Sequence, residues 1–307
     1  MSDPAAETAT AQEIRRLHLS GVLLVIAATI LLSAKAIFVK LIYVYDLTPA
    51  ELMVLRQGAS VPLYLMLFLW YLARRQHRLP DIRSCLVISL TGIIGYYAAT
   101  LLDLIALQTV PANLQRLIIY LFPTLVVLFS WRRPGNRIGR REVVTMVICY
   151  CGLLLYFTGA GGFGDAVLTR GALIGFGSTL CYAVYLVLAD PLIRREGAFV
   201  FTSLSMLAAF APTLLHHYLA GGTNPLDFHP RAIGLGVALG LFSTVLPSYL
   251  LSMGIQRMGS ARAGIIAMFG PVATAVMAFF IIGETLSPVQ GTGMLVVIGG
   301  VYYLSRK

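Results

Sequence analysis

The sequence predicts an all-α integral membrane protein whose ten transmembrane helices form two inverted repeats of five helices each. Three observations support this fold class: the composition, the number of long apolar segments, and an internal duplication. Hydrophobic residues make up 58% of the 307 residues, and charged residues make up only 12%. A soluble protein of this length carries about twice that charged fraction. The mean hydropathy of +0.82 agrees, so most of the chain is expected to lie in a membrane.

Ten apolar segments along the chain are each long enough to cross about 30 Å of hydrocarbon as a helix. We expect them at residues 19–42, 49–72, 84–107, 111–131, 141–158, 170–189, 198–219, 231–254, 260–282 and 287–305. Membrane-spanning strands are the poorer interpretation, because they are shorter and alternate polar with apolar residues.

The two halves of the chain repeat one another. A shift of 148 positions superimposes most of the first half on the second, and a shift of 150 does so nearer the N-terminus. The matched pairs include Gly92–Gly240, Pro123–Pro271, Gly135–Gly283 and Gly152–Gly300 at the first shift, and Gly21–Gly171 and Pro62–Pro212 at the second. A nearly constant offset over such a length indicates a duplicated unit. Because each unit holds an odd number of helices, the second unit enters the membrane from the opposite side.

The duplication divides the chain into four parts. Residues 1–18 are small and polar and are expected to form a disordered cytoplasmic N-terminus. Residues 19–158 form the first repeat, residues 159–169 a glycine-rich outer linker, and residues 170–307 the second repeat.

The loop charges predict the orientation. Seventeen of the 23 Lys and Arg residues fall in segments predicted to lie inside, whereas only Arg170 and Arg231 fall in outer segments. Basic residues are retained on the cytoplasmic side of membranes. Ten spans with both termini cytoplasmic are therefore expected.

Composition and motifs disfavour several classes of function. The net charge of +10 does not indicate nucleic-acid binding, because the basic residues sit in short loops between spans. The four cysteines lie in or beside apolar runs, where they serve as small packing residues. The sequence contains no metal-spaced cluster, no Ser/His/Asp set and no phosphate-binding glycine loop. We expect neither an enzyme nor a bound cofactor.

Four ionisable residues lie deep inside predicted spans of the first half. They are Lys35, Arg56, Asp103 and Arg116. With a rise of about 1.5 Å per residue, all four lie at one level, roughly 7–11 Å below the outer boundary. Ionisable groups at such a depth face an interior or a watery cavity and find a partner. Lys40 and Glu51 lie nearer the interface, where such side chains snorkel.

Two interpretations of these charges remain open. Three cations against one carboxylate leave an excess of positive charge, which favours a site for a carboxylate or another anion. The alternative is an ion pair between Asp103 and Arg116 on adjacent helices, with Arg56 reaching the lipid headgroups.

Aromatic residues extend the same helix faces. Tyr96 shares a stripe with Asp103, Tyr120 shares one with Arg116, and Tyr249 lies in the second half. Such rings stack on an organic solute, although tyrosines near helix ends are more often interfacial anchors. His216 and His217 are interpreted as interfacial residues rather than proton carriers.

Two prolines occupy matching positions in the two halves. Pro123 and Pro271 lie in mid-span, where proline removes a helix hydrogen bond and bends the helix. They are candidate hinges for alternating access, and static kinks that shape a cavity explain them equally well.

The pattern around these prolines resembles the EamA branch of the drug/metabolite transporter superfamily. The second half carries it in Ala263, Pro271, Gly283, Glu284, Gln290, Gly291, Gly299 and Gly300. The first half is similar through Pro123 but has Asn136 where the second has Glu284. The resemblance covers nearly the whole chain. It implies a carrier of amino acids, metabolites or drugs in a bacterial inner membrane, most often an exporter, with a central cavity between the halves.

Together these observations predict a secondary transporter that exports small organic metabolites, such as amino acids or related carboxylates, by alternating access. Its partners are the lipid bilayer, the substrate and a coupling proton or cation, and both a monomer and a homodimer remain open. One alternative is an importer or multidrug carrier of aromatic, neutral or cationic solutes. A remote alternative is an intramembrane enzyme, for which Lys35, Asp103 and Arg116 are poorly suited.

Overall fold

The computed structural model describes residues 4–75, 80–107, 118–131, 139–159, 170–222, 224, 227–282 and 286–305. These residues form helices and their connections, and no strand occurs among them. The helices are α1 (Pro4–Ser33), α2 (Lys35–Tyr43), α3 (Pro49–Arg75), α4 (Ile82–Gly92), the π-helix η1 (Ile93–Ala98), α5 (Ala99–Leu107), α7 (Phe122–Trp131), α8 (Arg140–Gly159), α9 (Arg170–Glu196), α10 (Ala198–Leu219), α11 (Pro230–Gly240), the π-helix η3 (Leu241–Val245), α12 (Leu246–Met258), α13 (Ser260–Ala267), α14 (Gly270–Met277), the π-helix η4 (Ala278–Ile282) and α15 (Pro288–Ser305).

The chain is a multi-pass membrane protein. Seven helical stretches of the described part are long and apolar enough to cross a membrane: Pro49–Arg74, Ile82–Ala106, Arg140–Thr158, Arg170–Glu196, Ala198–Leu219, Pro230–Met258 and Ser260–Ile281. Shorter apolar helices, Leu19–Ser33 and Phe122–Trp131, lie within two more of the predicted spans. The tenth predicted span, 287–305, coincides with α15. The all-α membrane class is confirmed, while the total of ten spans stays a prediction.

The first helix departs from its predicted bounds at both ends. α1 begins at Pro4, inside the segment expected to be disordered, where alanine, glutamate and glutamine are good helix formers. At the other end α1 stops at Ser33, and α2 resumes at Lys35 after a one-residue turn. Lys35 therefore opens a new helix instead of lying within a continuous span.

Two π-helices occupy matching positions in the two halves of the chain. η1 follows Gly92, and η3 begins 148 residues later, directly after Gly240. A Cβ atom at Gly92 would clash with the backbone of Ser205 on α10. A Cβ atom at Gly240 would lie 3.1 Å from the carbonyl oxygen of Arg56 on α3. Each glycine thus lets its helix approach a helix of the other half closely.

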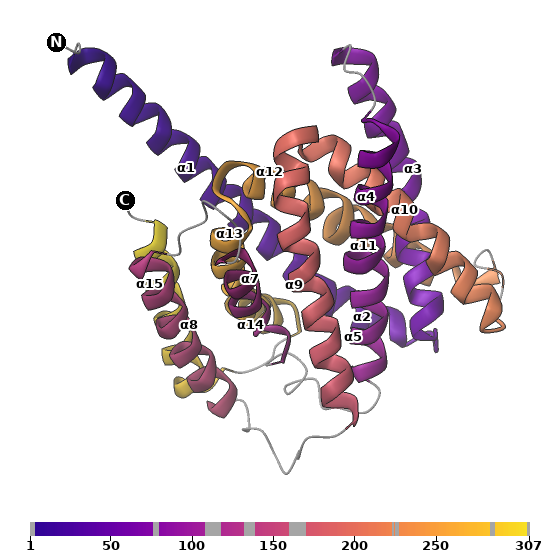
Figure 1. Ribbon diagram of the computed structural model, residues 1–307. Coiled ribbons are helices and arrows are strands. Elements are labelled where there is room, and N and C mark those ends of the chain that lie inside the picture. The colour runs from indigo at the N-terminus through magenta and orange to yellow at the C-terminus, as the bar shows by residue number, and fades with distance from the viewer. Residues whose placement is uncertain are drawn as a thin grey trace.

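The helices α8 and α15 pack side by side and form the left edge of the bundle in Figure 1. A Cβ atom at Gly152 would lie 2.8 Å from the side chain of Val297, and one at Gly300 would lie 2.9 Å from Sγ of Cys149. Gly300 is 148 residues after Gly152, and Cys149 is 148 residues before Val297. The two contacts are therefore reciprocal, as they are across a two-fold axis.

Apolar side chains occupy both the core and the outer surface of the bundle. Val25, Phe201 and Ile265 are fully buried in one large cluster that includes residues of both halves. Large apolar residues such as Phe280 remain 78% exposed. An exposed apolar surface is compatible with surrounding lipid. Helices are stable in lipid because each satisfies its backbone hydrogen bonds internally.

Candidate functional site

A small cavity lies among α2, α3, α5 and α11, near the end of the bundle where α2 leads into α3. It is lined by Lys35, Val39, Leu52, Met53, Arg56, Thr100, Leu104 and Leu239. Six of these side chains are apolar or hydroxyl-bearing, and the other two are cations. The cavity therefore brings together two of the four ionisable residues that the sequence singles out.

Local structure places both cations at the cavity. Lys35 is the first residue of α2, directly after the break at Ala34. Arg56 lies two turns into α3, whose start is fixed by a capping box: the backbone N–H of Thr48 donates to Oε2 of Glu51 at 2.8 Å, and the N–H of Glu51 donates to Oγ1 of Thr48 at 3.3 Å. Glu51 was expected to snorkel, and the structure instead uses its carboxylate in this cap. The side chain of Lys40 lies outside the described part.

Asp103 completes this group from α5, on the same helix as Thr100 and Leu104. Its carboxylate interacts electrostatically with Lys35 and with Arg56, while the two cations repel one another. None of the ion pairs within 4.0 Å between described residues includes Lys35 or Arg56. Arg116, the fourth predicted member, lies outside the described residues. The cavity wall thus holds two cations close to a single described carboxylate.

The three predicted aromatic residues contact residues that do not line the cavity. The Tyr96 hydroxyl bonds that of Tyr185 at 2.6 Å, and the Tyr249 hydroxyl bonds Oγ of Ser203 at 2.7 Å. The Tyr120 side chain packs against Gly270, at the start of α14. No member of this trio is among the residues that line the described cavity.

Sequence reasoning missed a buried amide beside Arg56. Gln57 is only 4% exposed, and its Nε2 donates to the carbonyl oxygen of Tyr96 in η1 at 3.3 Å. Its Oε1 is buried and has no hydrogen-bond partner among the residues that the structure describes. An amide inside an apolar segment next to an arginine was the available signal.

A sequence model described as the EamA-like transporter family matches this chain twice, over residues 19–158 and 169–306. The chain belongs to the EamA family.

Relatives of this EamA transporter are themselves named as transporters. The chain is 28% identical over 300 residues to the uncharacterised transporter YcbK of Bacillus subtilis, with 93% of this chain and 91% of that protein covered. It is 27% identical over 186 residues to the threonine/homoserine exporter RhtA of Escherichia coli, with 61% and 60% covered. A solved crystal structure superposes with a TM-score of 0.77 at 23% identity, covering 92% of this chain and 96% of that chain, and supports the fold alone.

The prolines shared by the two halves of this EamA transporter follow breaks in their helices. Pro123 is the second residue of α7, after a turn at residues 120–121, and Pro271 is the second residue of α14, after a turn at 268–269. Proline suits a first helical turn, because the N–H it lacks has no intrahelical acceptor there. The sequence predicted kinked helices at these prolines, and the structure instead has helices that are interrupted there. The hinge role stays a prediction.

Proposed function

We propose that this protein exports small organic metabolites, such as amino acids or related carboxylates, across the bacterial inner membrane by alternating access. The proposal rests on one observation: Lys35 and Arg56 line one cavity, and neither forms an ion pair with a described residue. Asp103 places one negative charge near these two cations. Cations in an apolar wall are costly unless counter-charges balance them, and a substrate carboxylate supplies the second negative charge. The name of the exporter RhtA supports both the substrate class and the direction.

The remaining predicted site residues take supporting roles in this proposal. Arg116, near the start of the predicted span 111–131, adds a third cation. Asp103 limits the excess of positive charge. Tyr96, Tyr120 and Tyr249 supply rings and hydroxyls deeper in the bundle. The two matched halves move against one another about the breaks before Pro123 and Pro271. The reciprocal contacts of α8 with α15 support a two-fold relation between the halves, and the loop charges support cytoplasmic termini.

One observation favours a second candidate, a carrier of aromatic or neutral solutes. The rings of Tyr64 and Tyr249 lie 5.6 Å apart, and Phe199 lies 5.1 Å from Tyr249. A ring cluster of this kind stacks on aromatic solutes. Such a carrier does not depend on the two cations of the cavity.

Uptake into proteoliposomes tests the proposal against this rival. The purified protein is reconstituted and given a panel of amino acids, including threonine and homoserine, monocarboxylates and aromatic cations, with and without a pH gradient. Arg56→Gln and Lys35→Gln are expected to reduce transport of the carboxylate substrates about tenfold or more, the value of a charge-assisted hydrogen bond. Arg83→Gln is the matched control, because Arg83 is exposed on α4.

Two outcomes would contradict the proposal. Carboxylate transport that survives both Arg56→Gln and Lys35→Gln would remove the anion site. The multidrug alternative would be favoured if the unmodified protein did not transport carboxylates and if the two variants transported cations faster.

A further inference from the structure

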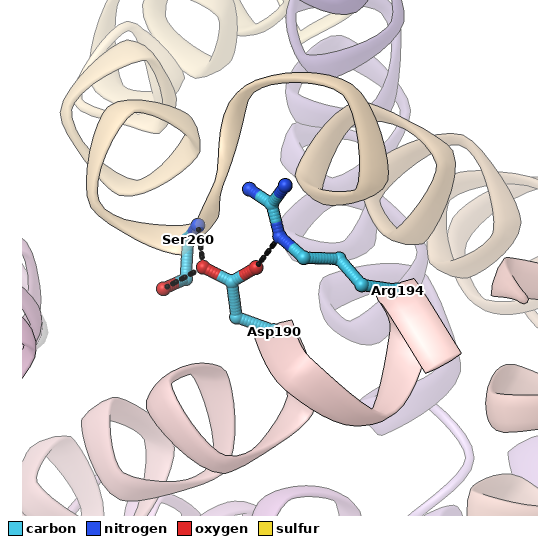
Figure 2. A network of polar contacts seen from close by, with 3 residues as sticks. All are labelled: Asp190, Arg194 and Ser260. Carbon is cyan, nitrogen blue, oxygen red and sulfur yellow. Dashed lines mark hydrogen bonds and ion pairs between the residues drawn. The ribbon is translucent and has the colours of Figure 1, made fainter. Parts of the chain in front are cut away.

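A carboxylate holds the start of α13 against the end of α9. Oδ2 of Asp190 accepts the backbone N–H of Ser260 at 2.9 Å and the Ser260 hydroxyl at 3.1 Å. Oδ1 accepts Nε of Arg194 at 2.8 Å, one turn along α9. Figure 2 shows the carboxylate between these two residues, pointing away from its own helix toward the turn that begins α13. The contact caps a helix N-terminus with a negative charge, which its unpaired N–H groups favour.

The backbone before α13 is shaped to make this contact. Gly259 has φ of +85°, a conformation that disfavours any side chain, and joins α12 to α13 in a single residue. A Cβ atom there would lie 3.4 Å from Oδ2 of Asp190 and 3.3 Å from the Arg194 guanidinium. Because Gly259 has no side chain, the turn can approach the Asp190 carboxylate closely.

A second carboxylate holds the same turn of α13 from the other half of the chain. Nε of Arg262 donates to Oε1 of Glu142, at the start of α8, at 2.9 Å. The Glu142 side chain is 10% exposed and that of Asp190 is 11% exposed. The first turn of α13 is thus joined to α9 by one buried carboxylate and to α8 by another.

A third ion pair at this end differs in exposure. Arg195 lies 3.2 Å from Asp81, but their side chains are 67% and 56% exposed. Ion pairs exposed to water contribute little to stability, because solvent screens their charges. This pair therefore offers a control for charge at the same end of the bundle.

The buried carboxylates and the cavity lie at opposite ends of α3. Leu52 and Met53 of the cavity belong to its first turns, whereas Asp81 follows its end and pairs with the residue next to Arg194. The loop charges predict that the cavity end faces outward and that Asp190 and Glu142 face the cytoplasm.

The duplicated positions lack both contacts. The shifts of 150 and 148 place Lys40 opposite Asp190, and Ala112 opposite Ser260. They likewise place Gln290 opposite Glu142, and Leu114 opposite Arg262. The contacts of Asp190 and Glu142 therefore occur at one end of the bundle only. With the two halves oppositely oriented, their equivalent positions fall at the other end, and no acid–base pair stands there.

We propose that Asp190 and Glu142 are gating residues, which hold α13 against α9 and α8 and keep the cytoplasmic end closed while the cavity is open to the outside. This inference rests on the proposed function, since it assumes a carrier that alternates between two openings. Opening the inner end separates α13 from both neighbours, and so breaks the bonds that Ser260 donates to Asp190 and that Arg262 donates to Glu142. The bond between Arg194 and Asp190 lies within α9 and is kept. Because the equivalent positions of the outer end carry no acid–base pair, we expect the outward-open state to be the more populated one.

Cysteine accessibility tests this proposal without any substrate. In a variant whose four native cysteines are replaced, Thr100→Cys reports from the cavity, and Ala263→Cys reports from the buried side of α13. A membrane-impermeant thiol reagent is applied to either face of oriented vesicles. Asp190→Ala and, separately, Glu142→Gln are expected to raise labelling of Ala263→Cys from the cytoplasmic face about fivefold or more, and to lower outer labelling of Thr100→Cys, as a shift of population requires.

The control is Asp81→Asn, which removes the exposed pair and is expected to leave both labelling rates unchanged. Asp190→Asn keeps the side chain's shape and replaces Asp190→Ala should that variant fail to fold. The proposal is overturned if folded Asp190 and Glu142 variants label like the parent, or if Asp81→Asn has the same effect. Loss of carboxylate specificity in the transport assay with normal gating would instead count against the proposed function alone.

Discussion

Gly152 of α8 and Val297 of α15 pack so closely that a Cβ atom on the glycine would lie 2.8 Å from the valine side chain and 2.7 Å from the carbonyl oxygen of Gly293. The backbones of α8 and α15 touch at this point, as small residues permit between membrane helices. The reciprocal contact of Gly300 with Cys149 places the equivalent helices of the two halves against one another.

We expect Gly152→Ala to destabilise the protein by about 1–3 kcal/mol, since an overpacked contact with backbone cannot relax by moving one side chain. The midpoint of thermal unfolding in detergent measures this effect. Gly299→Ala on α15 is the control, because no atom lies within 4 Å of a Cβ at that position. Equal melting points for the two variants would show that α8 and α15 are not in contact.

The capping box at the start of α3 positions Arg56, so its loss is expected to act on both stability and transport. Thr48→Ala removes a cap whose loss costs about 0.5–2 kcal/mol, and Thr48→Ser keeps the hydroxyl that bonds the Glu51 N–H. We expect lower stability and a raised KM in the alanine variant, with near-normal values in the serine variant. Thermal unfolding and uptake kinetics measure the two quantities, and identical behaviour of both variants would exclude the cap.

The hydroxyl pair of Tyr96 and Tyr185 joins η1 to α9 in the interior. Tyr96→Phe leaves the other hydroxyl without its partner, which costs about 1–3 kcal/mol. The double variant Tyr96→Phe/Tyr185→Phe is expected to recover part of this loss, because it removes both polar groups. A double-mutant cycle of unfolding midpoints checks the coupling, and strictly additive effects would contradict the 2.6 Å bond.

Pro271 follows the break between α13 and α14. With alanine there, the new N–H can bond the carbonyl of Ala267 and extend one helix across the turn. We therefore expect Pro271→Ala to slow turnover severalfold while the protein stays folded. Pro288→Ala, at the exposed start of α15, is expected to leave turnover unchanged.

The membrane class follows from local sequence alone. The predicted span at 198–219 coincides with α10, because a long apolar segment in lipid satisfies its backbone only as a helix. The break at Ala34 was not predicted, since nothing in that apolar segment resembles a stop signal. The breaks before Pro123 and Pro271 carried such a signal, and were foreseen as bends.

The sequence by itself determined that the chain is a helical membrane protein and that its halves are related, and it predicts one common depth for Lys35, Arg56 and Asp103. Depth follows from counting residues along each helix, and each count is local. Only the tertiary structure decided that Asp190 meets Ser260, 70 residues away, and that Glu142 meets Arg262, 120 away. Such contacts depend on which helix faces pack together, and apolar segments that are hydrophobic all round carry little record of their partners.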